Sequence, residues 1–234
     1  MEKVFKSPEK EVLLLDNSTT LANALRRAIY EVKTLAVTEV EFFKNDSVLY
    51  DEILAHRIGL IPLKNEKIKE DSFIELPLKF EAKNDGDEIV SQDLGKQVAI
   101  DNLPIVRLNK GQKIEFIARA KIGTGKEHSR HLPGLIYYYH LNKVSLKKEA
   151  KKHLELAERF PRVFEVKNEE VEIKNEWACN FDEEDVDVKG VEIKPTEKIV
   201  FIVESFGMMP LEEIIESCVK ILEKNLEEVK KELS

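Results

Sequence analysis

Cysteine is scarce in this chain of 234 residues, where Cys179 and Cys218 are the only two. They lie far apart and no Cys-x-x-Cys pair is present, which disfavours a disulfide framework. No apolar run approaches the roughly 20 residues that a membrane helix needs. The opening MEKVFKSPEK also lacks the apolar stretch of a signal peptide. We therefore expect a cytoplasmic protein with no membrane partner.

Excess positive charge is missing as well. Lys and Arg number 37 against 45 Asp and Glu, which gives a formal net charge of -8. A protein that grips nucleic acid over much of its surface needs clustered cations, so any such contact is expected to be local or indirect. The hydrophobic residues, 42% of the chain, suffice for a sizeable core, and the length suits two modest lobes.

Signatures of catalysis are incomplete. The loop from Gly123 to Lys126 contains two glycines and a lysine, as a phosphate-binding loop does. However, Ala120 stands at the first glycine position of that signature, and Glu127 replaces the Ser or Thr that binds magnesium. We interpret the segment as a flexible contact loop and expect no catalytic residues.

The sequence contains two closely spaced histidines that could begin a zinc site, but no nearby pair that could complete it. His128 and His131 lie three residues apart, but this spacing is common in loops without metal and does not recur. Cys218 falls in an apolar helical pattern, which indicates a small core residue rather than a nucleophile. Glu127 is adjacent to this pair, but the residues that would have to complete a metal site are scattered along the chain: His140, His153 or Cys179.

Both ends of the chain carry amphipathic helix patterns. After candidate N-caps at residues 18–20, apolar positions recur with helical spacing at Leu21, Ala24, Leu25, Ala28, Ile29 and Val32. A second stripe follows Pro210 at Leu211, Ile214, Ile215, Cys218, Leu222, Leu226, Val229 and Leu233. Because one small sheet cannot cover two such stripes, we expect an exposed apolar surface suited to dimerisation.

Between these helices the pattern is mostly typical of strands. Residues 135–141 should pair with residues 113–122, the clearest strand, across the loop that joins them. A short helix over residues 50–58 should end at a left-handed Gly59, and a further helix is predicted over residues 145–159. The other predicted strands cover residues 11–15, 35–43, 163–166, 171–173 and 199–204.

These predictions describe an α+β fold. The economical arrangement builds one discontinuous dimerisation domain from residues 1–43 and 196–234, with a sheet and two long helices contributed by both chain ends. Residues 44–159 would form an inserted, mainly β domain. Residues 160–195 would form a small satellite subdomain.

The adjacent Arg26 and Arg27 on the first helix leave two functions open. One is an assembly surface, and the other is a self-associating nucleic-acid-binding module that uses this pair together with the Lys126 loop. An ordinary solvated pair of charges on a helix flank is the simplest interpretation of all.

Four separated segments resemble the D-type subunit of archaeal RNA polymerases, the counterpart of the N-terminal part of bacterial α and of the third-largest subunit of RNA polymerase II. The resemblance covers almost the whole chain, with its motifs in the same order. The segments are LANALRRAI (residues 21–29), SVLYDEILAHRIGLIPL (47–63), IGTGKEHSRHLPG (122–134) and FIVESFGMMPLEEII (201–215).

The resemblance implies a non-catalytic assembly subunit in a heterodimer with a small partner, the L-type subunit in archaea. The pair would form the platform for the large polymerase subunits and other small subunits, with nucleic acid contacted only through the complex. The small-partner interface would comprise Leu21, Leu25, Ile29, Ile214, Ile215, Leu222 and Leu226. The contacts to a large subunit would comprise Arg26, Arg27, His56, Arg57, Lys126 and His128, where arginine suits buried bidentate contacts.

In one region the chain departs from the resemblance. Many archaeal members carry an insert whose cysteines bind iron-sulfur clusters, and here the corresponding region, residues 160–194, keeps only Cys179. Phe160 stands where those members have a cysteine before the proline. Because a [4Fe-4S] cluster needs about four thiolates, we predict no cluster and no other cofactor.

Overall fold

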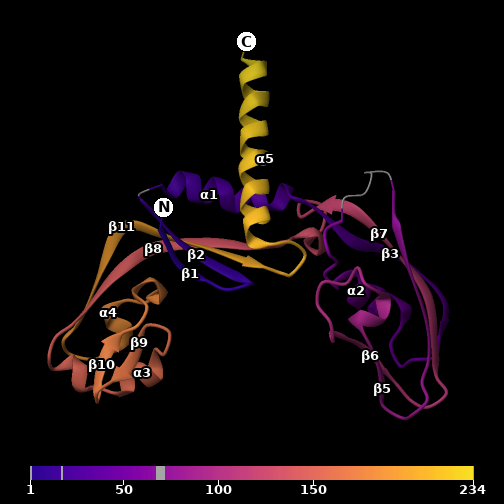
Figure 1. Ribbon diagram of the computed structural model, residues 1–234, viewed down its shortest axis with the longest axis horizontal. Coiled ribbons are helices and arrows are strands. Elements are labelled where there is room, and N and C mark those ends of the chain that lie inside the picture. The colour runs from indigo at the N-terminus through magenta and orange to yellow at the C-terminus, as the bar shows by residue number, and fades with distance from the viewer. Residues whose placement is uncertain (1, 17, 67–71, 234) are drawn as a thin grey trace. The chain divides into compact units, whose positions relative to one another are not determined.

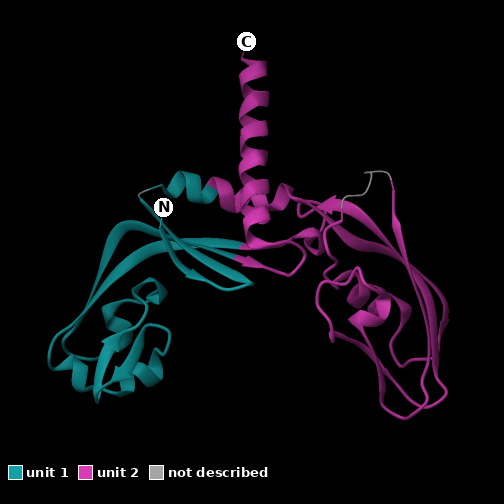
Figure 2. Cartoon of the chain, in the orientation of Figure 1, with its two compact units in different colours: residues 1–23, 136–203 teal, residues 24–135, 204–234 magenta. Residues whose placement is uncertain are grey.

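The computed structural model of the chain describes residues 2–16, 18–66 and 72–233. The chain mixes helices with several sheets, and it divides into two compact units that are both discontinuous in sequence (Figure 2). Unit 1 combines residues 1–23 with 136–203, and unit 2 combines residues 24–135 with 204–234.

A four-stranded sheet forms the first part of unit 1. Its strand order, β1-β2-β11-β8, joins strands from both ends of the sequence to one from the middle (Figure 1). Val12, Leu141, Val200 and Ile202 form a buried cluster on these strands. The strands are β1 (Glu2–Lys6), β2 (Lys10–Asp16), β8 (Gly134–Leu146) and β11 (Val191–Ser205).

The satellite segment, residues 147–190, forms the second part of unit 1. Its two strands make an antiparallel hairpin, and Leu156, Phe164, Val171 and Cys179 lie in an apolar core to which β8 and β11 also contribute side chains. The segment is therefore held together by hydrophobic burial. Its elements are α3 (Glu155–Arg159), β9 (Phe164–Lys167), β10 (Glu170–Ile173), α4 (Glu183–Val186) and 3-10 turns at Ala150–Lys152 and Glu176–Ala178.

Unit 2 contains a three-stranded antiparallel sheet of order β3-β7-β4 and a two-stranded antiparallel sheet, β5-β6. Helix α1 (Thr19–Ala28) crosses the boundary between the units. The strands are β3 (Lys33–Asn45), β4 (Ile74–Glu81), β5 (Asp87–Val90), β6 (Pro104–Leu108) and β7 (Lys113–Thr124). The helices are α2 (Asp51–Gly59) and α5 (Leu211–Glu232), with 3-10 turns at Ile29–Glu31, Ser91–Leu94 and Ser129–His131.

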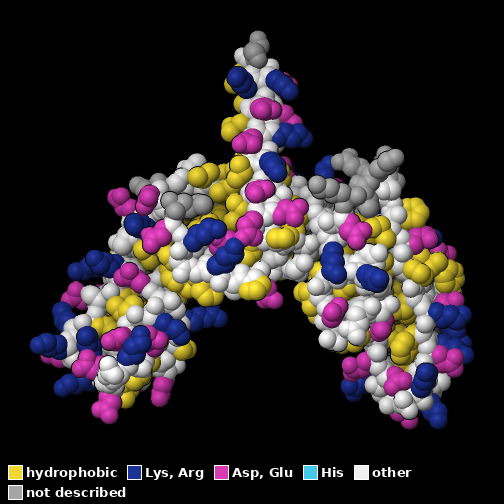
Figure 3. Space-filling model, in the orientation of Figure 1, with side chains coloured by type: hydrophobic (Ala, Val, Ile, Leu, Met, Phe, Trp, Pro, Cys, Tyr) yellow, Lys and Arg dark blue, Asp and Glu magenta, His cyan; other side chains and the backbone are white. Residues whose placement is uncertain are grey.

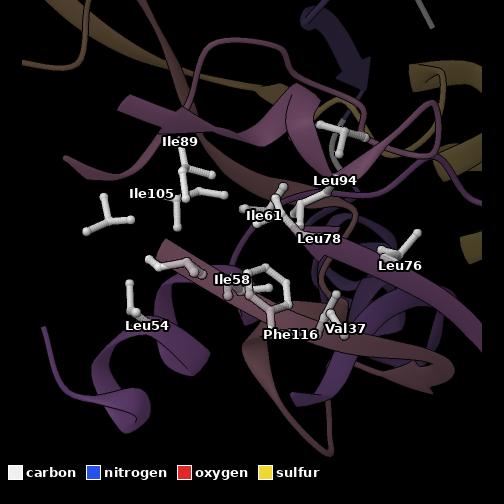
Figure 4. Close-up of a cluster of buried hydrophobic side chains, with 14 of the residues drawn as sticks. Val37, Leu54, Ile58, Ile61, Leu76, Leu78, Ile89, Leu94, Ile105 and Phe116 are labelled. Atoms are coloured by element: carbon white, nitrogen blue, oxygen red, sulfur yellow. The ribbon is translucent and has the colours of Figure 1, made fainter. Parts of the chain in front are cut away.

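The sequence pattern of β7 explains the core of unit 2. Ile114, Phe116, Ala118 and Ala120 are buried and alternate with more exposed residues, which is the two-residue period of a strand with one covered face. They pack with side chains from β3, β4, α2 and the β5-β6 pair, and the aromatic ring of Phe116 lies among aliphatic side chains (Figure 4).

Gly59 ends α2 near the predicted position but for a different reason. It does not adopt the left-handed conformation that we expected, and the C-cap residue Leu60 is right-handed with φ -93°. A Cβ atom at Gly59 would lie only 3.0 Å from Nη1 of Arg130. That nitrogen donates a 2.7 Å hydrogen bond to the carbonyl oxygen of Val37. The glycine therefore makes room for a side chain that joins a loop to β3.

Two predictions about the middle of the chain are wrong. Strand β8 pairs with β11 and not with β7, whose neighbours are β3 and β4. The helix predicted over residues 145–159 is mostly absent, because β8 continues to Leu146 and only α3 is α-helical. Val144, Ala150 and Leu156 are all buried in the core of the satellite segment, so tertiary burial outweighs the local helix propensity.

The two units also differ from the predicted domain boundaries. Strand β8 groups residues 136–146 with the strands of both termini, whereas the prediction assigned them to the inserted domain. As functional domains, the segments 1–43 with 196–234, 44–159 and 160–195 remain a prediction. Among the described residues, no helix combines the length and apolar composition that crossing a membrane requires.

Candidate functional site

Helix α5 carries two adjacent apolar stripes where the sequence suggested one. Both follow the alternating three- and four-residue spacing that keeps side chains on one face of a helix. We define the inner stripe as Leu211, Ile214, Cys218, Ile221 and Asn225. We define the outer stripe as Ile215, Val219, Leu222, Leu226, Val229 and the C-cap residue Leu233.

The inner stripe packs within the chain over the first two turns of α5. Leu211, Ile214 and Cys218 are buried, and α5 contacts the 3-10 turn Ile29–Glu31 of the same unit. Burial raises the pKa of Cys218 to about 12, so its thiol stays protonated and unreactive. The prediction that Cys218 is a core residue is therefore confirmed.

The outer stripe becomes more exposed along the helix. Ile215 and Leu222 are half-buried, whereas Leu226 is 70% exposed and Leu233 is 84% exposed. Figure 3 shows hydrophobic side chains among the charged ones along this helix. The helix itself is supported by the pairs Glu216–Lys220 and Lys224–Glu228, one turn apart. Its second half is thus a formed helix with an uncovered apolar face.

The residues predicted for the small-partner interface separate into buried and accessible sets. Ile214 is fully buried and Ile29 is 2% exposed, so both belong to the core of this chain and cannot contact a partner without a rearrangement. Leu21 on α1 is 48% exposed and Leu25 is half-buried. The accessible set on α5 consists of Ile215, Leu222 and Leu226, all in the outer stripe.

The loop over residues 124–133 is the point where several elements of unit 2 meet. The backbone N–H of Lys126 donates to the carbonyl oxygen of Tyr30 at 3.0 Å, which joins the loop to the turn after α1. Arg130 joins it to β3 beside the end of α2. A Cβ atom at Gly125 would lie 2.5 Å from Leu132, so this glycine serves close packing.

A reciprocal contact between Thr34 and His131 anchors the end of this loop. The Thr34 hydroxyl donates to the His131 carbonyl oxygen at 2.6 Å, and Nδ1 of His131 lies 3.0 Å from the Thr34 carbonyl oxygen. Because a carbonyl oxygen only accepts, Nδ1 carries the proton. Burial lowers the pKa of His131, so the neutral ring is favoured. His131 is thus a structural residue.

Four of the residues predicted to contact a large subunit lie on the two short helices. Arg27, His56 and Arg57 are exposed and Arg26 is half-buried. Arg57 donates from Nη2 to the carbonyl oxygen of Pro104 at 2.7 Å, which fixes its guanidinium beside β6. Within the described residues, the Arg27 side chain has no hydrogen bond or ion pair.

The other two predicted residues, Lys126 and His128, lie in the loop and are exposed. Nζ of Lys126 is 2.7 Å from Oε1 of Glu31, and this ion pair is the main reason that the pKa of Glu31 is lowered. Nδ2 of Asn225, at the end of the inner stripe, donates to the other oxygen of Glu31 at 3.5 Å. Glu31 therefore links the loop to α5, at the edge of a cavity of about 510 Å³.

Sequence reasoning missed two features of unit 2. One is Arg130, although it lies between His128 and His131 in a segment that carried the resemblance. The other is the α2 patch, which we define as Val48, Tyr50 and Ile53, with Val48 85% exposed. Exposed apolar side chains grouped at a turn and the start of a helix are a signal of contact with another molecule, but only a measure of exposure could show it.

The described residues contain no group of three or more His, Cys, Asp or Glu side chains that could hold a metal ion. Cys179 lies in the core of the satellite segment, where Sγ donates to the carbonyl oxygen of Phe181 at 3.6 Å and burial raises the pKa of the thiol. The donor set therefore does not fit a cluster with four thiolate ligands.

Comparisons with known proteins identify relatives over nearly the whole chain. The family described as RNA polymerase Rpb3/Rpb11 dimerisation domain matches residues 11–226. The DNA-directed RNA polymerase subunit Rpo3 of Pyrococcus horikoshii is 35% identical over 240 residues, which cover 94% of this chain and 92% of that protein. Rpo3 of Thermococcus kodakarensis is 40% identical over 219 residues, covering 86% and 84%. Rpo3 of Archaeoglobus fulgidus is 30% identical over 252 residues, covering 98% and 94%.

Proposed function

The chain belongs to the archaeal Rpo3 family of DNA-directed RNA polymerase subunits, which are the D-type subunits that its sequence resembles. From this membership we propose that it is a non-catalytic assembly subunit. It pairs with a small subunit of the L type, and the pair then recruits the large catalytic subunits and further small subunits. The chain contributes surfaces to the transcribing enzyme and no reacting groups.

The outer stripe of α5 is the observation that carries this proposal. An apolar face with Leu226 70% exposed and Leu233 84% exposed is costly to leave in water, since burying each Leu side chain fully is worth roughly 1.5–3 kcal/mol. Obligate interfaces are large and resemble a protein core. The three- and four-residue spacing of the stripe suits packing against another helix. A small partner that lays a helix along α5 would cover it.

We assign the recruitment of a large subunit to the exposed residues of α1, α2 and the loop over residues 124–133. Arg27, His56 and Arg57 offer cationic and hydrogen-bonding groups, and the α2 patch adds apolar area close in sequence to His56 and Arg57. Glu31 holds Lys126 in place through its ion pair. Such a combination of an apolar centre and an arginine-rich rim is typical of subunit contacts.

We also propose that the chain binds no iron-sulfur cluster. The whole sequence contains two cysteines, and the apolar core around Cys179 stabilises the satellite segment without metal. Iron and acid-labile sulfide in the purified protein, measured per chain after anaerobic purification, should stay at background. One cluster per chain would contradict the proposal.

Co-expression with the L-type subunit of the same organism tests the pairing directly. Native mass spectrometry should show a 1:1 complex, and replacement of Leu226 by Asp should strongly reduce its amount. Glu227→Ala, at an adjacent exposed position that is not in the outer stripe, is the matched control and should leave the complex intact. An amount of complex that is unchanged by Leu226→Asp would contradict the assignment of the outer stripe.

A further inference from the structure

A cavity of about 410 Å³ lies in unit 1, between the four-stranded sheet and the satellite segment. Four aromatic side chains line it: Phe5 on β1, Tyr137 and Tyr139 on β8, and Trp177 in the satellite segment. Three of them are held by contacts with one another, because the Tyr139 hydroxyl donates to the Trp177 carbonyl oxygen at 2.6 Å and the ring centroids of Phe5 and Trp177 are 5.5 Å apart. The cavity is therefore built by packing that brings two parts of the unit together.

The charged residues that line this cavity are all cationic. They are Lys10, Arg162 and Lys174, and no described Asp or Glu lines it, although the chain as a whole has a net charge of -8. Lys10 is engaged with Tyr137, to whose hydroxyl it donates at 3.1 Å. By contrast, neither the Arg162 guanidinium nor the Lys174 ammonium makes a hydrogen bond or ion pair with any residue that the structure describes. The charge of Lys174 also helps to lower the pKa of Glu165, which does not line the cavity. An excess of cations at a concave site attracts an anion.

The backbone around Arg162 is held in place. Nδ2 of Asn175 donates to the Arg162 carbonyl oxygen at 3.1 Å, and the backbone N–H of Lys174 donates to the Val163 carbonyl oxygen at 2.8 Å. These bonds join the two cation-bearing segments on one side of the cavity. Burial also raises the pKa of Tyr139 to about 12, so this hydroxyl adds no negative charge that would repel an anion.

We propose that this cavity binds a nucleotide unit, with the base against the aromatic side chains and the phosphate on Arg162 and Lys174. A planar base stacks favourably on aromatic rings whatever its identity, and the guanidinium fork matches the oxygens of a phosphate. The volume lies within the range of small-ligand pockets. A nucleotide unit also carries a planar base and an anionic phosphate together, whereas an acidic peptide side chain carries a charge and no ring.

Trp177 is the only tryptophan of the chain, so its fluorescence reports on the cavity directly. Titration of the full-length chain with ADP should change this fluorescence saturably. Arg162→Ala should weaken the apparent affinity about tenfold, in keeping with the loss of a charge-assisted bond, and Lys174→Ala should weaken it less. The matched control is Lys189→Ala, which removes one exposed cation of the satellite segment outside the cavity lining. Circular dichroism verifies that each variant is folded.

Ligands that carry only part of a nucleotide, and ligands of other classes, test whether the cavity recognises both the base and the phosphate. Adenosine and inorganic pyrophosphate should each bind more weakly than ADP, because each offers only half of the recognised groups. Displacement of ADP by a short single-stranded oligothymidylate would identify the source as a nucleic-acid strand, and lack of displacement would identify a free nucleotide. The proposal is overturned by an unsaturable response, by equal affinity of the Arg162→Ala and Lys189→Ala variants, or by an acidic Glu-Phe-Glu peptide that binds more tightly than ADP.

Discussion

The inner and outer stripes of α5 are similar in sequence and opposite in environment. Both are apolar over most of their length, both follow the same spacing, and they lie side by side on one helix. Yet Ile214 and Cys218 are fully buried in this chain, whereas Leu226 and Val229 are mostly exposed. The difference shows that an amphipathic pattern identifies a surface that must be covered but does not say which molecule covers it.

The largest effect is expected from truncation of the inner stripe. Ile214→Ala should lower the free energy of unfolding of the isolated chain by about 2–5 kcal/mol, because a fully buried side chain leaves a cavity. Leu226→Ala, its counterpart in the outer stripe, should change that free energy by less than about 0.5 kcal/mol. Urea unfolding followed by circular dichroism measures both. Equal losses would remove the distinction between the stripes.

A charge introduced into the outer stripe should weaken partner binding without unfolding the chain. Leu226→Asp should leave the isolated chain folded but weaken binding of the small partner at least about 30-fold, which corresponds to the roughly 2 kcal/mol of an interface hot spot. Isothermal titration with the L-type subunit measures this change. Unaltered affinity would mean that the outer stripe is not the partner surface.

The third change affects neither stripe. Arg27→Ala should preserve the heterodimer and reduce capture of a large polymerase subunit about tenfold, because one exposed guanidinium contact is lost. Quantitative co-purification measures the effect, with Lys148→Ala as a control for the change in charge. Normal capture of the large subunit by the Arg27→Ala variant would mean that Arg27 is an ordinary solvated charge on the helix and makes no subunit contact.

The smallest effect concerns the end of the inner stripe, where Glu31 bonds to Lys126 and Asn225. The pKa of Glu31 is lowered chiefly by Lys126, so this carboxylate contributes stability above its unfolded pKa near 4.5. That contribution is lost as the pH falls through the lower, folded pKa. Since the pair is partly exposed, it should amount to at most about 1 kcal/mol.

Comparison with Glu31→Gln isolates this contribution from the other carboxylates. The difference in unfolding free energy between the natural chain and the variant should be largest near neutral pH and should shrink on acidification below about pH 4.5. A difference that is constant with pH would show that the ionisation of Glu31 does not help to hold α5.

The sequence predicted secondary structure best where burial and periodicity agree. The alternation at Ile114, Phe116 and Ala118 correctly located β7, and the stripes correctly located α5. The wrong predictions concern segments whose structure depends on residues that are distant in the sequence. The segment after Leu146 has local helix propensity, but pairing of β8 with β11 and burial of Ala150 in the satellite core give it another structure. Nothing in a local pattern identifies the strand with which β8 pairs.

The candidate site was predictable in its composition but not in its geometry. The spacing of the apolar residues located the apolar side of α5. It did not separate the two stripes, because their centres differ by only about 80° around the helix axis, which is less than the rotation of one residue. The four-segment resemblance indicated the loop over residues 124–133. Only the structure shows that Arg130 and His131 hold this loop in place while Lys126 and His128 remain exposed.

Hydrogen exchange along α5 tests the central claim most directly. In the isolated chain, amides of residues 214–218 should be protected by the packed inner stripe, while those of residues 226–232 should exchange faster because nothing covers that half of the helix. Addition of the L-type partner should slow exchange in residues 226–232 most strongly. Exchange over residues 226–232 that is equally slow with and without the partner would contradict the account.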